Sequence, residues 1–454
     1  MGRELGFRSF PDDYGNVIID ADPAPGQEKA PRIILQAHMD MVTQAGPEAE
    51  KDPARDAVEW YLDDGWIQAK DTTLGADDGI GMAAALAYLD QVEDRPFTRL
   101  IFTRAEEANM DGAKALDPDL LDGDFLLNLD SEQEGVAIDA SPGSVHGAFH
   151  LPLEREALPE DWSLGQIVLG GLRGGHSGVA ILDVHTNAIK SLSDLLRKLP
   201  EELDFRLVSF QAGLASNVIP DSARAVVAFP SQSREQFQEA LEEVGGKVKE
   251  ILLKSDPDTY FEMTEIPERL KPMTRLVGQK VLSLLESLPH GVQELSEDKS
   301  RVVTSTNLAM VACEENSLSF DLLSRSLLYT SLEEVKRKIL EIIKVFQAEG
   351  GFAISYPIWE AREDSLLRKA YRKVYLNRFG EEAVVQPVHT GLECSIFSKK
   401  NPDLDILSIG PTIEKAHTPL ERLDAASCVR YFDLLCDLVK EISSRTREEA
   451  GESV

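Results

Sequence analysis

Three short apolar segments that each end in acidic or histidine side chains constrain the fold of this chain most strongly. The first begins at Ile33 and runs out into His38 and Asp40, and the others cover residues 99–105 and 124–130. Such runs predict buried strands, and strands that alternate with helices favour a mostly parallel sheet. Because open α/β sheets place ligand sites at the carboxyl ends of their strands, we expect a polar site there.

The chain has 454 residues, which is too long for one ordinary hydrophobic core. Residues 1–143 and 358–454 both alternate helices with strands, whereas residues 144–357 alternate paired strands with helices. The sequence therefore predicts an α/β domain in two parts, with a mixed, mostly parallel sheet and helices on both faces. An α+β domain is inserted between the two parts.

Charge and cysteine content exclude several classes of protein. The net charge is -32, from 79 acidic and 47 basic residues, and it repels nucleic-acid phosphates and anionic membranes. The four cysteines form no CxxC pair, which indicates a reducing compartment. Neither a membrane-spanning apolar run nor a signal peptide is expected, so we predict a cytoplasmic protein.

A glycine-punctuated turn at residues 71–81 leads into an alanine-rich segment that predicts a helix. A phosphate-binding loop is one reading of this turn, but the Walker lysine is absent and Asp77 and Asp78 would repel an anion. The turn therefore favours a cation, although both aspartates could also serve as helix N-caps.

Two histidines and three carboxylates stand out as candidate metal ligands. They are His38, Asp77, Glu107, Asp130 and His417. Imidazole and carboxylate donors suit zinc, manganese or cobalt. Five donors exceed what one zinc ion needs, but they suit two ions that share one carboxylate and lower the pKa of a bridging water. Glu106, beside Glu107, is the candidate general base for hydrolysis.

Six motifs appear in a fixed order along the chain. They are His38-Met39-Asp40, Leu74-Gly75-Ala76-Asp77-Asp78-Gly79, Glu106-Glu107, Asn128-Leu129-Asp130-Ser131-Glu132, Gly174-Gly175-His176-Ser177-Gly178 and His417-Thr418-Pro419. Together they resemble the dizinc aminoacylase/carnosinase-type metallopeptidases over nearly the whole chain, and among these the aminoacyl-histidine dipeptidases. Two departures are Ser395, where glycine is common, and a start near the end of the helix that usually opens the family.

The resemblance implies that the five candidate ligands hold two divalent ions, with Asp77 bridging. Zinc is the expected metal, with cobalt and manganese as alternatives. Asp40 would orient His38, and Glu106 would act as the general base on a hydroxide that bridges the ions. The family often has a cis peptide bond after the bridging aspartate, which corresponds to Asp77–Asp78 here.

Residues 144–357 resemble the lid and dimerisation domain of the family, which implies a homodimer formed through this domain. By the same resemblance, His176 would stabilise the oxyanion, often in the partner's site. Asn217 and Arg325 would bind the C-terminal carboxylate of the substrate, as a guanidinium does well. Gly391 would line the substrate cleft.

The implied activity is hydrolysis of dipeptides, Xaa-His among them, with broad specificity. Within the family, a tripeptidase and an N-acyl amino acid deacylase are the alternatives. A serine hydrolase is a more distant rival, because residues 175–179 nearly match a nucleophile elbow but carry Val179 at the last position. A catalytically inactive binding protein on the same fold is a further rival, and the complete ligand set argues against it.

Overall fold

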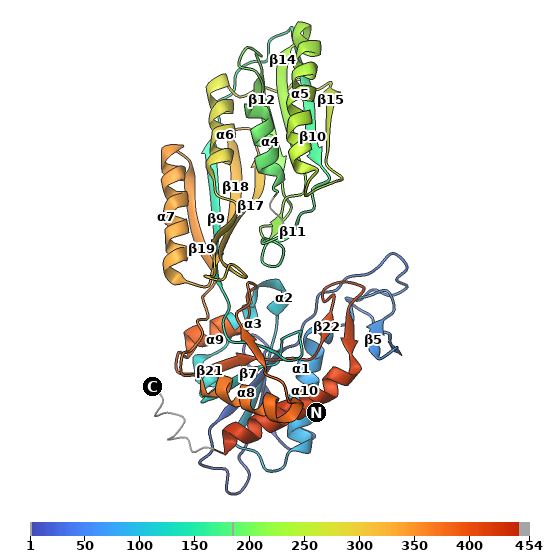
Figure 1. The fold of residues 1–454 in the computed structure, drawn as a ribbon, viewed down its shortest axis with the longest axis vertical. Coiled ribbons are helices and arrows are strands. Elements are labelled where there is room, and N and C mark those ends of the chain that lie inside the picture. Colours follow the sequence, from blue (N-terminus) through green and yellow to red (C-terminus); the bar gives the residue numbers. More distant parts are fainter. Residues whose placement is uncertain (1, 184–185, 445–454) are drawn as a thin grey trace. The chain divides into compact units, whose positions relative to one another are not determined.

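The computed structural model describes residues 2–183 and 186–444. The chain forms two compact units (Figure 1). The first unit comprises Met1–Ser141 and Trp359–Val454, and the second comprises Pro142–Ile358.

An eight-stranded sheet forms the centre of the first unit. In spatial order its strands are β1 (Arg8–Pro11), β2 (Val17–Ala21), β6 (Thr98–Thr103), β3 (Ile33–His38), β7 (Phe125–Asn128), β21 (Asp405–Ser408), β8 (Val136–Ile138) and β20 (Val384–Gln386). Strands β6, β3, β7 and β21 pair in parallel, while β1, β2 and the β21–β8 pair are antiparallel. The prediction of a mixed, mostly parallel sheet is confirmed, and the four parallel strands end at one edge.

Helices cover both faces of this sheet, and the buried side chains of β3 alternate between the two faces. Ile33, Leu35 and Ala37 share a buried core with α1 (Ala76–Gln91), α8 (Leu366–Phe379) and α10 (Ala425–Ser443). Gln36 points to the other face, where it contacts Glu393 at the start of a further helix. The helices of that region are α2 (Glu106–Asn109), α3 (Asp111–Ala115), η1 (Pro118–Leu121) and α9 (Cys394–Lys400).

A small four-stranded sheet packs against the start of α1. Its order is β22 (Ile413–Glu414), β23 (Arg422–Asp424), β5 (Trp66–Ala69) and β4 (Trp60–Asp63). Ile413 and Leu423 share a core with Ala76, the first residue of α1. The turn between β22 and β23 therefore comes close to the beginning of that helix.

The second unit is built on a nine-stranded antiparallel sheet. The strands follow the order β15 (Tyr260–Ile266), β10 (Trp162–Gly170), β14 (Ala223–Pro230), β12 (Arg206–Ala212), β17 (Val302–Cys313), β18 (Ser317–Ser326), β9 (Gly143–Pro152) and β19 (Glu349–Tyr356), with β16 (Gly291–Leu295) paired to β17. A separate two-stranded ladder joins β11 (Gly175–His176) to β13 (Val218–Ile219).

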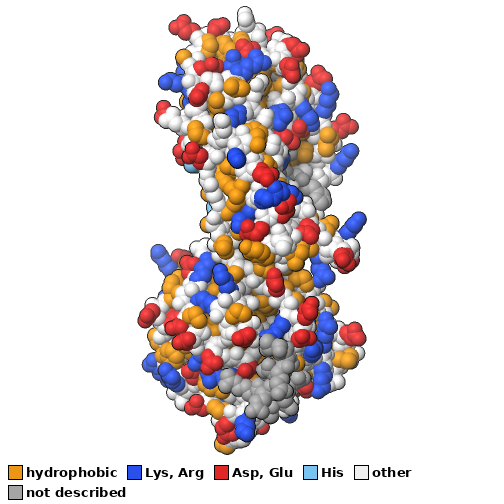
Figure 2. Space-filling model, turned by 90° about the vertical axis from the view of Figure 1, so that its left-hand side faces the viewer, with side chains coloured by type: hydrophobic (Ala, Val, Ile, Leu, Met, Phe, Trp, Pro, Cys, Tyr) orange, Lys and Arg blue, Asp and Glu red, His pale blue; other side chains and the backbone are white. Residues whose placement is uncertain are grey.

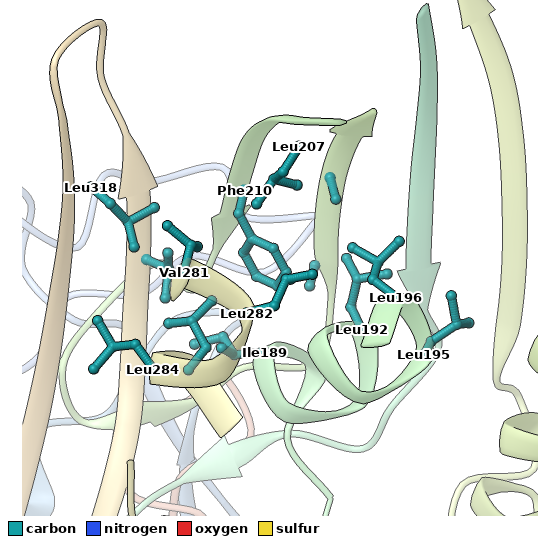
Figure 3. Close-up of a cluster of buried hydrophobic side chains, with 14 of the residues drawn as sticks. Ile189, Leu192, Leu195, Leu196, Leu207, Phe210, Val281, Leu282, Leu284 and Leu318 are labelled. Atoms are coloured by element: carbon teal, nitrogen blue, oxygen red, sulfur yellow. The ribbon is translucent and has the colours of Figure 1, made fainter. Parts of the chain in front are cut away.

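One large apolar core holds the helices of the second unit against this sheet (Figure 3). The helices are α4 (Ala188–Arg197), α5 (Arg234–Leu252), α6 (Arg275–Ser287) and α7 (Tyr329–Val345), and η2 (Ser231–Ser233) precedes α5. In Figure 3, Ile189 and Leu192 of α4 and Val281 and Leu282 of α6 lie in one cluster with Phe210 of β12. An α+β architecture was predicted for this part of the chain, and it is confirmed.

Acidic and basic side chains are interspersed on the face of the molecule that Figure 2 shows. Among the described residues, we find no helix with the length and apolar content needed to cross a membrane.

Candidate metal centre

The candidate metal centre begins with His38, the last residue of β3. Its side chain is 1% exposed, and its Nε2 lies 3.1 Å from Asp77 Oδ1 and 3.4 Å from Asp130 Oδ1. Asp130 follows β7, which pairs in parallel with β3, so the two strands deliver their terminal side chains to one place. Burial tends to lower the pKa of His38. The neighbouring carboxylates of Asp130 and Asp77 outweigh this effect and raise the pKa well above its usual value.

Asp77 lies between two histidines. Its Oδ1 faces His38, and its Oδ2 lies 2.9 Å from Nε2 of His417. Burial tends to raise the pKa of Asp77, but the hydrogen bonds from His38 and His417 outweigh it and hold this pKa below its usual value. The Asp77–Asp78 peptide bond is cis, as the resemblance implied. A carboxylate that presents one oxygen to each imidazole has the arrangement expected of a bridging ligand.

His417 completes the centre from the turn between β22 and β23. Its Nε2 also lies 2.9 Å from Oε1 of Glu107, at the start of α2. The hydrogen bond with Asp77 and the adjacent carboxylate of Glu107 raise the pKa of His417 to about 11. The carboxylates that stabilise an imidazolium here would equally stabilise a bound cation, because both effects arise from the same local negative charge.

The five predicted ligands are thus brought together. Their contacts form one series, from Asp130 through His38, Asp77 and His417 to Glu107. Within the described residues, three groups have donor atoms that all lie within 4.8 Å of one another. These groups are His38 with Glu106 and Glu107, His38 with Asp78 and Asp130, and Asp77 with Glu107 and His417.

The donor set fits divalent metal ions. Each group combines one imidazole with two carboxylates, which is the chemistry that zinc, manganese and cobalt prefer. Glu107 Oε1 is buried and has no hydrogen-bond partner among the described residues, despite its short distance from His417 Nε2. Glu107 Oε1 and His417 Nε2 therefore face each other without forming a hydrogen bond, as expected of two ligand atoms that bind the same ion.

Asp40, which was expected to orient His38, contacts the His38 ring through its backbone. Its backbone oxygen, rather than its carboxylate, lies 2.9 Å from Nδ1 of His38, and the nearer carboxylate oxygen is 3.9 Å away. The carboxylate instead accepts hydrogen bonds of 3.1 Å from the backbone N–H groups of Glu106 and Glu107. Strand β3 ends at His38, so Asp40 lies beyond the strand, where successive side chains need not alternate between two faces.

Glu106, the predicted general base, is the first residue of α2 and is partly buried. Burial, followed by the charge of Asp130, raises the pKa of Glu106 well above its usual value. This carboxyl group therefore lies among carboxylates that favour its protonated form, which suits a group that must hold a proton for part of a reaction.

A buried polar network lies at the sheet beside the centre. Glu393 Oε2 accepts hydrogen bonds from Gln36 of β3 and Thr103 of β6, and Gln36 accepts one from Asn128 of β7. Burial raises the pKa of Glu393 to about 8. Gly391, predicted to line the substrate cleft, precedes Glu393 in the same loop and so belongs to the first unit.

The other predicted site residues belong to the second unit. His176 pairs with Val218 in the β11–β13 ladder, and Asn217 immediately precedes β13. The backbone N–H of Ser177 donates to the Asn217 carbonyl at 2.8 Å. His176 and Asn217, which are far apart in sequence, are therefore held on neighbouring segments.

Arg325 lies in β18 between Ser144 of β9 and Ser305 of β17. Its side chain is nearly buried and donates a hydrogen bond to the Tyr356 hydroxyl. The Nε atom of Arg325 is buried and has no partner among the described residues, so the guanidinium retains a donor for an additional acceptor.

Two further residues of the first unit belong to the surroundings of the centre: Asp78, noted from sequence only as part of a cation-favouring turn, and Glu421, which the sequence did not indicate. Asp78 accepts a hydrogen bond from the His38 backbone N–H and belongs to one of the three donor groups. Glu421 is 3% exposed and accepts from the backbone that leads into α1. Asp78 could be found from sequence because it lies next to Asp77. Glu421 could not, because its contacts join segments that are remote in sequence.

Residues 167–256 match the peptidase dimerisation domain of the M20 family. The chain is 33% identical to the cytosol non-specific dipeptidase of Escherichia coli K12 over 446 residues, which is 98% of this chain and 92% of the relative.

Solved structures of two peptidases are also similar to this chain. The aminoacylhistidine dipeptidase of Vibrio alginolyticus is similar with a TM-score of 0.82 and 33% identity, over 97% of this chain and 90% of that one. A tripeptidase from Staphylococcus aureus is similar with a TM-score of 0.55 and 16% identity, over 98% and 91% of the two chains. The second likeness shows the fold alone.

Proposed function

This chain belongs to the M20 peptidase family, and from that premise we propose that it is a dipeptidase whose active site holds two divalent metal ions. It is a peptide hydrolase, as its relatives are. The observation that carries the proposal is the position of Asp77, which presents one carboxylate oxygen to His38 and the other to His417.

The distances suggest how the ligands divide between the ions. His38, Asp77 and Asp130 would hold one ion, and Asp77, Glu107 and His417 the other. Zinc is the proposed metal, with cobalt or manganese as alternatives, because the donors are imidazoles and carboxylates. When bound, such a pair polarises a substrate carbonyl and lowers the pKa of a water molecule toward neutrality.

Glu106 is proposed as the general base. It would accept the proton of the attacking water and later give it to the amine that leaves when the peptide bond breaks. Its raised pKa supports this role, because a carboxylate of higher pKa is a stronger base toward the attacking water. Asp40 would position it by holding the backbone at the start of α2.

Residues 144–357 are proposed to form a lid and dimerisation domain, and the chain a homodimer. The match of residues 167–256 to a dimerisation domain supports this. Arg325 and Asn217 would bind the substrate's C-terminal carboxylate, and His176 would stabilise the oxyanion. The buried, unpartnered Nε of Arg325 is a donor suited to a carboxylate.

The proposed substrates are dipeptides, with Xaa-His among them and broad specificity. Two relatives at 33% identity carry the names of a non-specific and an aminoacylhistidine dipeptidase. Tripeptides and N-acyl amino acids are the alternative substrates.

The cytosol is the proposed location, by similarity to the relative from Escherichia coli.

A substrate screen on the full-length chain tests this proposal. We expect dipeptides with a free C-terminal carboxylate to be hydrolysed much faster than matched tripeptides and N-acyl amino acids. A chelator should abolish the activity and added Zn²⁺ or Co²⁺ should restore it, whereas a serine-directed reagent should have no effect. Preference for tripeptides or acyl amino acids would favour the alternatives, and activity that survives complete metal removal would refute the metal-dependent proposal.

A further inference from the structure

Glu421 is a buried carboxylate four residues after His417, in the turn that joins β22 to β23. It is 3% exposed, and its own backbone N–H donates to the Thr418 carbonyl at 3.0 Å. A buried carboxylate is costly unless it is paired or fully hydrogen-bonded, so its partners explain why it is there.

These partners are four consecutive backbone N–H groups at the start of α1. Oε2 accepts from Leu74 at 2.8 Å and Gly75 at 3.0 Å. Oε1 accepts from Ala76 at 2.8 Å and, more weakly, from Asp77 at 3.4 Å. The first turn of a helix leaves N–H groups without intrahelical partners, and these groups together with the helix dipole favour a negative charge.

Glu421 therefore caps the N-terminus of α1, which has no side-chain cap from its own N-cap residue. The N-cap residue Gly75 has a φ of 72° and offers no side chain to accept a hydrogen bond. The cap comes instead from a residue more than 340 positions away in sequence. Loss of this carboxylate would leave several buried N–H groups without an acceptor.

The same contacts join the two segments that carry Asp77 and His417. The side chains of these residues meet at 2.9 Å, between Asp77 Oδ2 and His417 Nε2. The His417 turn also has left-handed backbone at Lys415 (φ 56°) and His417 (φ 64°), a conformation that non-glycine residues adopt only with support from their surroundings. Glu421 supplies such support at the end of the turn.

We propose that Glu421 is a positioning residue that holds the Asp77 and His417 segments at the separation needed to bind the metal pair. This inference rests on the proposed function. Glu421 does not ligate the ions, but it fixes the backbone of one ligand and the turn of another. Outer groups that orient metal ligands typically contribute about 10- to 100-fold to metal affinity or activity.

The test compares metal affinity in Glu421→Gln and wild type. Zn²⁺ is titrated into the metal-free, full-length chain against a chromophoric chelator, and the absorption spectrum of the Co²⁺-loaded chain reports ligand geometry. We expect Zn²⁺ to bind about 10- to 100-fold more weakly to Glu421→Gln. The Co²⁺ spectrum should shift, and excess metal should restore most of the activity with the KM for dipeptide unchanged.

Asp405→Asn is the matched control. Asp405 is a buried carboxylate of the same unit that accepts from Ser365 Oγ and the Leu367 N–H at the start of α8. It is the first residue of β21 and pairs with Phe125, so it lies at the edge of the sheet opposite the metal centre. This variant should lose stability but keep the wild-type affinity for Zn²⁺.

The inference would be overturned if Glu421→Gln bound Zn²⁺ as tightly as wild type. It would also be overturned if Glu421→Gln and Asp405→Asn lost Zn²⁺ affinity equally. If Glu421→Gln does not fold, Glu421→Asp replaces it, because it keeps the charge but is one methylene too short for all four contacts. The inference then requires the Zn²⁺ affinity of Glu421→Asp to be lower than that of Asp405→Asn. A wild-type chain that binds no Zn²⁺ would instead refute the proposed function, and this inference with it.

Discussion

Replacement of Glu106 by glutamine is expected to lower kcat for dipeptide hydrolysis by about 10²- to 10⁴-fold while the bound metal remains. Glutamine keeps the size of the side chain but cannot accept a proton from water or return one to the leaving amine. The hydrogen bond from the Glu106 backbone to Asp40 does not depend on the side chain, so α2 should keep its place.

The measurement pairs steady-state kinetics with metal analysis of the same preparations. Glu441→Gln is a suitable control, because Glu441 is a glutamate of the same unit that forms a surface ion pair with Lys373. It should retain wild-type kcat. If Glu106→Gln retains near wild-type kcat, or loses metal in proportion to activity, then Glu106 is not the general base.

Replacement of Asp77 by asparagine should lower both activity and metal content, because it removes a ligand from both proposed ions. An asparagine offers one oxygen and an NH₂ group, and the NH₂ group would face one of the two histidines as a donor rather than a ligand. Changes in groups that only orient ligands cost up to about 100-fold, so loss of a shared ligand should cost more than about 100-fold in activity.

Metal content separates this effect from simple unfolding. We expect Asp77→Asn to keep its circular dichroism spectrum but to lose metal, whereas Asp405→Asn should lose stability and keep metal. A folded Asp77→Asn chain with the full wild-type metal content would contradict a bridging role for Asp77.

The fold of the first unit could be predicted from sequence because its central strands are buried and rich in apolar residues. Strand β3 lies within the apolar run from Ile33 to His38, and every residue of it is buried. Other strands lack this signal. All residues of strands β15 (Tyr260–Ile266) and β19 (Glu349–Tyr356) are exposed or half-buried. Edge strands with solvated side chains carry little apolar periodicity.

The candidate ligands could be predicted because each follows a recognisable element. His38 and Asp130 come at strand ends, and Asp77 comes after a glycine turn. The role of Glu421 could not be predicted, because it depends on a contact between the His417 turn and α1 that forms only in the folded chain. The hydrogen bonds of the Asp40 carboxylate to the backbone of Glu106 and Glu107 also could not be predicted, because Asp40 lies beyond the end of β3.

The central claim is that the side chains of His38, Asp77, Glu107, Asp130 and His417 bind a pair of divalent ions. Elemental analysis tests it most directly, after the full-length chain has been equilibrated with Zn²⁺ and freed of unbound metal. We predict about two ions per wild-type chain, as a two-metal site requires, and fewer in Asp77→Asn. A wild-type chain that hydrolyses dipeptides while retaining no metal would contradict the account.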